Sequence, residues 1–239
     1  MRWIAVALLY LMAAPALAVT CEDVRFEGKR FTTCTVDAVS ETLRLFHRDA
    51  QGEVLGSFRA INADLDDKQL LFAMNAGMYH EDRSPVGHYV ENGVETMHVI
   101  PNAGPGNFGL LPNGVFCIND DSAQVYETRA FIDQAPACRD ATQSGPMLVI
   151  DGALHPRFLP DSTSRFIRNG VGTNADGTQA VFAISNERVS FHEFGRLFRD
   201  YLQLPNALYF DGKVSRLHAP ALGRSDVGFQ LGPIVGVVR

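Results

Sequence analysis

The chain has 239 residues, of which 46% are hydrophobic and 20% are charged, and its formal net charge is −6. This length is enough for one domain with a full core, and we find no repeat, low-complexity tract or linker that would divide it. The modest negative charge is spread along the chain without a basic stripe, which makes nucleic acid and anionic membranes poor partners.

The N-terminal residues have the pattern of a secretory signal peptide. Met1-Arg2-Trp3 is a short basic start, Ile4–Met12 is an apolar segment too short to span a bilayer, and Ala16-Leu17-Ala18 is an A-x-A cleavage site. Cys21 follows Val19-Thr20, whereas a lipoprotein signal has a small residue directly before its cysteine. We therefore predict a signal peptide over residues 1–18, a single domain over residues 19–239, a periplasmic or secreted location and no stable membrane anchor.

Four cysteines remain in the predicted mature chain, namely Cys21, Cys34, Cys117 and Cys138. An even number in an exported chain indicates disulfides, and four cysteines allow three pairings. We favour Cys21–Cys34, which closes an N-terminal hairpin, together with Cys117–Cys138. A zinc site is the competing interpretation, but the chain has no Cys-x-x-Cys and no His at ligand spacing from these cysteines. We predict neither a metal nor a cofactor.

The rest of the chain shows many short strands and little helix. Apolar or alternating runs bounded by turn residues are typical of strands, and Asn92-Gly93 is the strongest hairpin signal. Phe58–Leu65 is predicted as a short helix. The predicted strands are a hairpin over 24–36 around Glu27-Gly28-Lys29, then Thr42–His47, Leu70–Met74, Val86–Glu91, Val94–Ile100, Phe108–Leu111, Val115–Ile118, Met147–Ile150, Phe166–Thr173, Gln179–Ile184 and Asn206–Phe210.

The clearest helix begins after Ser190. Ser190-Phe191-His192-Glu193 is a capping box, in which the serine hydroxyl and the glutamate carboxylate satisfy two backbone amides. Gly195 weakens this helix by about 1 kcal/mol and indicates close packing. An apolar stripe at helical spacing is formed by Phe194, Leu197, Phe198, Tyr201 and Leu202. Together these elements predict a mixed α/β (α+β) fold with a large, mixed, partly antiparallel sheet and few helices.

Polar residues and glycines stand where predicted strands end. Asp211-Gly212 follows the buried strand 206–210, and Asn75-Ala76-Gly77 follows Leu70–Met74 in the same way. Loops at strand ends are where a rigid sheet presents chemistry. Either motif alone is an ordinary turn. The functional interpretation therefore depends on their occurring as a set.

Two further motifs contain candidate ligand-binding residues. Arg168-Asn169-Gly170-Val171-Gly172 places a guanidinium, which binds phosphate or carboxylate oxygens, beside two glycines. The alternative for a lone arginine is a surface ion pair. Ser144-Gly145 precedes another strand, but no Gly-x-Ser-x-Gly elbow is present and none of the seven histidines forms a metal-ligand pair, which disfavours a serine or metal-dependent hydrolase. Among the histidines, His192 and His88 are the better candidates.

An ordered series of motifs over roughly residues 40–235 resembles the phosphodiester glycosidase family. The series is Asn75-Ala76-Gly77-Met78-Tyr79, Pro85-Val86-Gly87, Ser144-Gly145-Pro146-Met147-Leu148, Arg168-Asn169-Gly170-Val171-Gly172, the Ser190 helix and Asp211-Gly212-x-x-Ser215. The resemblance implies one mixed α/β domain whose motifs gather at a cleft and which hydrolyses a sugar-1-phosphodiester. Lys213-Val214 departs from the family, which commonly has glycines there, and Asn75–Tyr79 departs from its frequent Asn-Gly-Gly-Phe-Phe. A lysine at that place alters the access and the charge of the loop.

On this basis we expect Asp211 to be the acid/base or nucleophilic carboxylate and Arg168 to neutralise the phosphate. The expected substrate is a small or polymeric glycan phosphodiester. An alternative from another class is a non-catalytic periplasmic protein on the same fold that binds glycans or the envelope. The expected substrate-binding residues are Asn75, Gly77, Tyr79, Ser144, Gly145, Asn169, Gly172, His192, Gly212 and Ser215.

Overall fold

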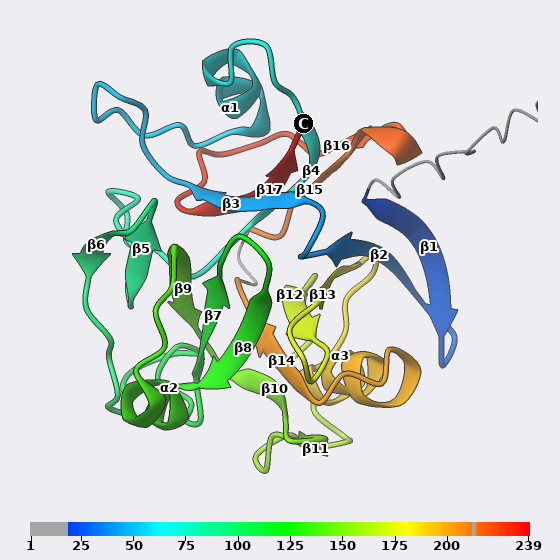
Figure 1. Ribbon diagram of the computed structural model, residues 1–239. Helices are drawn as coiled ribbons and strands as arrows, with labels where there is room; N and C mark the ends of the chain where they lie inside the picture. The colour runs from blue at the N-terminus through cyan, green and yellow to red at the C-terminus, as the bar shows by residue number, and fades with distance from the viewer. Residues whose placement is uncertain (1–18, 212–213) are drawn as a thin grey trace, which may run out of the picture.

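A computed structural model describes residues 19–211 and 214–239 as one domain of antiparallel strands with few helices (Figure 1). The predicted mixed α+β fold class is confirmed. Where we expected one large sheet of mixed strands, the described residues form three sheets, and all their ladders are antiparallel. The predicted signal peptide, Gly212 and Lys213 lie outside the described residues.

The largest described sheet contains β14, the strand that precedes the predicted motif at Asp211. Its strand order is β1-β2-β13-β12-β14-β10-β11. The strands are β1 (Thr20–Phe26), β2 (Lys29–Asp37), β10 (Met147–Ile150), β11 (Ala153–Leu154), β12 (Asn169–Thr173), β13 (Gln179–Ser185) and β14 (Asn206–Tyr209). Because β14 lies between β12 and β10, the end of β14 emerges from the interior of the sheet and not from its edge.

Two five-stranded sheets complete the described fold. One has the order β16-β15-β4-β17-β3, and the other has the order β6-β5-β9-β7-β8. The first contains β3 (Thr42–Phe46), β4 (Leu70–Asn75), β15 (Leu217–Ala219), β16 (Arg224–Ser225) and β17 (Ile234–Val238). The second contains β5 (Tyr89–Glu91), β6 (Val94–Met97), β7 (Gly114–Ile118), β8 (Ala123–Glu127) and β9 (Asp140–Ser144).

Short helices pack against these sheets. Helix α1 (Phe58–Asp64) contacts β4, α2 (Thr128–Gln134) contacts β7 and β8, and α3 (Phe191–Arg196) contacts β10. The capping box of α3 is confirmed, since the Ser190 hydroxyl accepts from the Glu193 amide at 3.1 Å and the Glu193 carboxylate accepts from the Ser190 amide at 2.8 Å. None of the helices in the described segments has the length and apolar character needed to span a bilayer.

An aromatic core joins the three sheets. The ring of Phe182 in β13 lies 4.7 Å from that of Phe72 in β4 and 5.8 Å from that of Phe116 in β7. Phe210 packs against the same group, with its ring 6.3 Å from that of Phe116, and all four side chains are fully buried. Each such burial stabilises the fold by about 1.5–3 kcal/mol. Phe210 therefore anchors the chain directly before Asp211.

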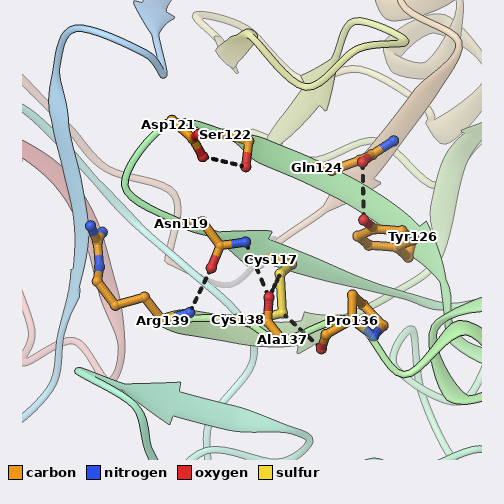
Figure 2. Close-up of a disulfide and its surroundings, with 10 residues drawn as sticks. All are labelled: Cys117, Asn119, Asp121, Ser122, Gln124, Tyr126, Pro136, Ala137, Cys138 and Arg139. Atoms are coloured by element: carbon orange, nitrogen blue, oxygen red, sulfur yellow. Dashed lines mark hydrogen bonds between the residues drawn. A yellow bond between two sulfur atoms is a disulfide. The ribbon is translucent and has the colours of Figure 1, made fainter.

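Both predicted disulfides are present. Cys21 and Cys34 are cross-strand partners in the β1–β2 hairpin, and Cys117 of β7 is bonded to Cys138, just before β9. Figure 2 shows the second bridge beside Asn119, whose amide group donates to the Ala137 carbonyl at 3.1 Å and accepts from the backbone amide after Cys138 at 2.9 Å. The disulfide and these hydrogen bonds hold together the two ends of the segment between β7 and β9, which contains β8 and α2.

Two local predictions were wrong. Phe108–Leu111 does not form a strand; it lies in a turn. The helix after Ser190 keeps its α-helical winding only to Arg196 and continues as a π-helix over Leu197–Tyr201, in which the amide of residue 202 donates to the Leu197 carbonyl at 2.9 Å. A π-helical turn rotates the following side chains relative to α-helical spacing. Tyr201 is accordingly exposed instead of completing the apolar stripe.

Candidate active site at the end of strand β14

Asp211 follows β14, and the predicted motifs hold the backbone on either side of it. The buried Ser144 hydroxyl donates to the Phe210 carbonyl at 2.7 Å. The Ser215 hydroxyl lies 2.7 Å from the Asp211 carbonyl, to which it donates. The Asp211 amide in turn donates to the side-chain oxygen of Asn169 at 3.3 Å. Three separate segments of sequence thus fix the backbone from which the Asp211 carboxylate extends.

Two buried asparagines connect this segment to the neighbouring sheet. The Asn169 amide group donates to the Asn75 carbonyl at 2.9 Å, which joins the start of β12 to the end of β4. The Asn75 side-chain oxygen accepts from the Arg216 backbone amide at 2.8 Å. Asn75 and Asn169 are both fully buried. Buried polar groups of this kind stabilise a structure only when each has a partner, and here their partners flank Asp211.

Three pockets share walls around Asp211 and form one cleft. The aromatic pocket, of about 520 Å³, is lined by Met78, Tyr79, His80, Val86, Pro105, Gly106, Asn107, Phe108, Phe166, Tyr209 and Asp211. The arginine pocket, of about 480 Å³, is lined by Phe166, Ile167, Arg188, Val214, Ser215, Arg216 and Phe229. The small pocket, of about 280 Å³, is lined by Tyr79, His80, Glu81, Arg83, Asp211, Val214, Phe229 and Gln230. Volumes of this size suit small-molecule ligands.

The Asp211 carboxylate lies within electrostatic reach of two tyrosine hydroxyls. Burial and then the charge of Asp211 raise the pKa of Tyr79, while Arg83 and Arg216 act in the opposite direction. Burial also raises the pKa of Tyr209, and Asp211 adds to that rise. Both hydroxyls therefore keep their protons at neutral pH and can donate them to a carboxylate or to a ligand oxygen. The aromatic pocket thus combines one carboxylate with the Tyr79 hydroxyl, and the buried Tyr209 hydroxyl lies behind its wall.

Arg168 lies behind this pocket and does not line it. Its guanidinium is only 1% exposed and stacks on Phe191, with 3.6 Å from Cζ to the ring centroid. Nε donates to the Val189 carbonyl at 2.9 Å, whereas Nη1 has no hydrogen-bond partner among the described residues. Burial lowers the pKa of Arg168, and the neighbouring Tyr209 hydroxyl opposes that shift. Direct contact between Arg168 and a phosphate stays a prediction.

The motif glycines serve close packing. A Cβ on Gly77 would lie 2.6 Å from the Gln143 carbonyl, and a Cβ on Gly145 would lie 2.7 Å from the Asn113 Cβ. A Cβ on Gly172 would lie 2.7 Å from the Leu204 Cδ1. Such distances exclude a side chain without displacement of the neighbour. Gly77 thus lets the end of β4 approach β9, Gly145 lets the end of β9 approach the start of β7, and Gly172 lets β12 approach Leu204. A direct role for these glycines in substrate binding stays a prediction.

His192 is the second residue of α3 and is not among the side chains that line the three pockets. Its role in substrate binding stays a prediction. In the described segments, no three His, Cys, Asp or Glu side chains gather as metal ligands would.

Sequence reasoning missed several residues of the cleft. Arg216 and Arg188 line the arginine pocket, and Glu81 lines the small pocket as the second carboxylate of the cleft beside Asp211. Arg216 directly follows the Ser215 motif, so its position in the chain could have indicated it. Phe229 offered no such signal because it lies in a loop with no periodic pattern and reaches the cleft only through the fold.

A second titratable cluster lies in β5, outside the pockets of the cleft. Burial raises the pKa of the Glu91 carboxyl to about 7, Asp140 adds to the rise, and Arg44 opposes it. The Tyr89 hydroxyl donates to Glu91 at 2.8 Å and opposes the rise as well. Burial lowers the pKa of the nearby His47, whose ring packs edge-on against Tyr89. This cluster gives the fold a group that titrates near neutral pH.

The fold and the cleft define a class of protein: an antiparallel α+β domain that presents a carboxylate among aromatic and cationic side chains at a strand end. The family model described as phosphodiester glycosidase matches residues 68–218. The chain belongs to the phosphodiester glycosidase family. It is also 34% identical over 213 residues to the uncharacterized protein YigE of Escherichia coli (strain K12), covering 88% of this chain and 83% of YigE.

Solved structures share the fold. The catalytic domain of zebrafish N-acetylglucosamine-1-phosphodiester alpha-N-acetylglucosaminidase, auto-inhibited by its pro-peptide, superposes with a TM-score of 0.62 at 10% identity, over 92% of this chain and 82% of that one. A hypothetical protein from Synechocystis gives a TM-score of 0.61 at 16% identity, over 94% and 64% of the two chains. A putative exported protein from Burkholderia pseudomallei gives a TM-score of 0.51 at 11% identity, over 87% of this chain and 74% of that one. Identities this low establish the fold alone.

Proposed function

We propose that the protein is an exported hydrolase that cleaves the bond between a sugar and the phosphate of a glycosyl phosphodiester. The observation that carries this proposal is the position of Asp211, whose backbone is held by three sequence motifs and which lines the aromatic pocket with Tyr79, next to a pocket lined by two arginines. Family membership supports the reaction class, and the two disulfides support an oxidising compartment such as the periplasm.

The aromatic pocket suits the sugar. The partly exposed Tyr79 offers its ring to the apolar face of a sugar and its hydroxyl to the polar edge, while Phe108 and the buried Tyr209 form the wall behind it. The neighbouring arginine pocket suits the phosphate, because guanidinium groups bind phosphate oxygens in a planar, two-pronged arrangement. Asp211 lines the aromatic and small pockets, and Ser215, which donates to its carbonyl, lines the arginine pocket.

In this reaction the bond between the sugar C1 and the bridging oxygen breaks, and the phosphate monoester leaves with the bonding electrons. A phosphate leaves as a stable anion, so most of the barrier lies in forming positive charge at C1. Asp211 stabilises that charge and either attacks C1 or takes a proton from the attacking water, whose oxygen ends on the sugar. Arg188 and Arg216 neutralise the departing phosphate, and Arg168 acts from behind Tyr209 through its charge.

The position of the isotope after hydrolysis in ¹⁸O-labelled water tests this proposal. Purified protein is incubated with a panel of sugar-1-phosphodiesters, and the products are analysed by mass spectrometry. We expect the label in the released sugar. Label in the phosphate product would mean cleavage on the phosphorus side and would contradict the proposal. Binding without release would favour a glycan-binding protein, and inhibition by a chelator or a serine-directed reagent would favour another hydrolase class.

A further inference from the structure

The arginine pocket combines two features that rarely share one small cavity. Among the described residues neither Arg188 nor Arg216 makes an ion pair with a carboxylate; the exposed Arg188 offers its whole guanidinium to an anion, whereas the buried Arg216 donates to the Phe229 carbonyl through Nη1 and adds its charge to the pocket. The rest of the lining is dominated by apolar side chains, among them Phe166, Val214 and Phe229. An anion with an apolar substituent matches both features, whereas a fully polar ligand would leave the apolar wall in water.

Phe229 extends this apolar wall into solvent. Its side chain is 83% exposed, and that of Val227, two residues earlier in the same loop, is 91% exposed. Large apolar side chains this exposed and this close to a ligand pocket indicate an interaction surface. Phe229 both lines the arginine pocket and is exposed to solvent. A ligand that fills the pocket and extends outward along Phe229 therefore stays in contact with apolar surface.

The loop that carries Phe229 is held in place. The Arg216 guanidinium donates to the Phe229 carbonyl through Nη1, and a Cβ on Gly228 would lie 2.8 Å from the Arg216 Cζ. At the other end, the Asp226 carboxylate accepts from the Leu217 amide at 3.0 Å and pairs with Arg224 at 2.9 Å. Exposure of the two apolar side chains is therefore built into the loop and does not result from fraying. A preorganised surface loses little conformational entropy when it binds.

We propose that the arginine pocket binds the phosphate and the first carbons of an apolar aglycone, so that the substrate is an amphiphilic glycosyl phosphodiester. This inference rests on the proposed function and adds the chemistry of the leaving group. The sugar occupies the aromatic pocket, the phosphate lies against Arg188 and Arg216, and the apolar chain lies along Phe166 and Phe229. After hydrolysis the product that leaves through the arginine pocket is an alkyl-type phosphate monoester.

Chain-length dependence tests the inference. Methyl, butyl and octyl phosphodiesters of one sugar are compared below the micelle concentration. We expect kcat/KM to rise by about fourfold for each methylene that leaves water for the pocket. Phe229→Ser should reduce the octyl-over-methyl preference by about tenfold, because serine removes the apolar wall that the longer chain contacts. Val94→Ser is the matched control, because Val94 is 62% exposed and lines none of the three pockets.

Binding measurements separate this inference from the proposed reaction. Calorimetry compares octyl phosphate with inorganic phosphate for the wild type, Phe229→Ser and Arg188→Gln. We expect octyl phosphate to bind more tightly than inorganic phosphate, Phe229→Ser to reduce that difference by about tenfold, and Arg188→Gln to weaken both ligands. If these affinities were found but no sugar-1-phosphodiester were hydrolysed, the inference about the arginine pocket would stand and the proposed hydrolysis would be refuted. Equal kcat/KM for methyl and octyl substrates, or equal affinity for the two phosphates, would overturn the inference.

Discussion

Replacement of Asn169 by alanine should disable the cleft and destabilise the fold together. The Asn169 side chain donates to the Asn75 carbonyl at 2.9 Å and accepts from the Asp211 amide at 3.3 Å, and it is fully buried. Alanine leaves both backbone groups without these partners. An unsatisfied buried group costs about 1–3 kcal/mol. We therefore expect the free energy of unfolding to fall by about 3 kcal/mol, which in a chain of this size lowers Tm by about 6–12 °C.

The effect on activity follows from the same contacts. Without the Asn169 side chain, Asp211 loses its own link to β12, while the backbone bond from the Phe210 amide to the carbonyl of residue 169 remains. A displacement of about 1 Å at a catalytic group costs roughly a hundredfold in rate. Urea denaturation and kcat/KM for a sugar-1-phosphodiester measure the two effects on one preparation. Asn62→Ala is the control, because the Asn62 side chain also accepts from a backbone amide, that of Leu70 at 2.8 Å, but lies in α1.

We expect Asn62→Ala to lower stability by about 1 kcal/mol without loss of kcat/KM. If Asn169→Ala kept both the denaturation midpoint and the kcat/KM of the wild type, the two asparagines would not hold Asp211 in place. A loss of stability equal to that expected, with unchanged kcat/KM, would show that the position of this segment does not determine the reaction.

Three more predictions concern stability. Because the pKa of Glu91 is raised to about 7, the folded state binds this proton more tightly than the unfolded chain, so its contribution to stability falls as pH rises from 4.5 to about 7. Relative to Glu91→Gln, the wild type should lose about 3 kcal/mol over that window in urea titrations, and parallel curves would contradict this. Arg168→Lys should cost about 2 kcal/mol because lysine lacks the planar stack on Phe191, and an unchanged midpoint would refute that role. Gly77→Ala should cost about 1–3 kcal/mol, whereas Gly104→Ala, whose Cβ would meet nothing closer than 3.9 Å, should cost less; equal losses would contradict the packing argument.

Local signals allowed much of the fold to be predicted from sequence. The capping box at Ser190 depends on residues three apart, the turn at Asn92-Gly93 on two neighbours, and the Cys21–Cys34 bridge on a short hairpin. Each is encoded within a few residues, so single-sequence reasoning recovers it. The turn at Phe108–Leu111 was missed because an apolar run flanked by glycine and proline satisfies the strand pattern, while the fold uses Phe108 to line a pocket.

The sequence indicated which strand-end motifs belong together, but not how their side chains are arranged or which other residues line the cleft. The strand-end motifs do converge, yet Asn75 and Asn169 meet across 94 positions of sequence and hold the backbone instead of facing the pocket. Whether a buried polar side chain contacts the substrate or positions its neighbour depends on long-range packing. The exposed Arg188 and Phe229 belong to no motif, and only the tertiary structure brings them to Ser215.

The most direct test of the central claim is the activity of Asp211→Asn. Asparagine keeps the size of the side chain and removes its charge, so we expect no change in Tm and a loss of turnover of at least about a thousandfold on a sugar-1-phosphodiester. Affinity for octyl phosphate should stay close to that of the wild type, because the arginine pocket is intact. Turnover close to wild type in this variant would contradict the assignment of Asp211 as the catalytic carboxylate.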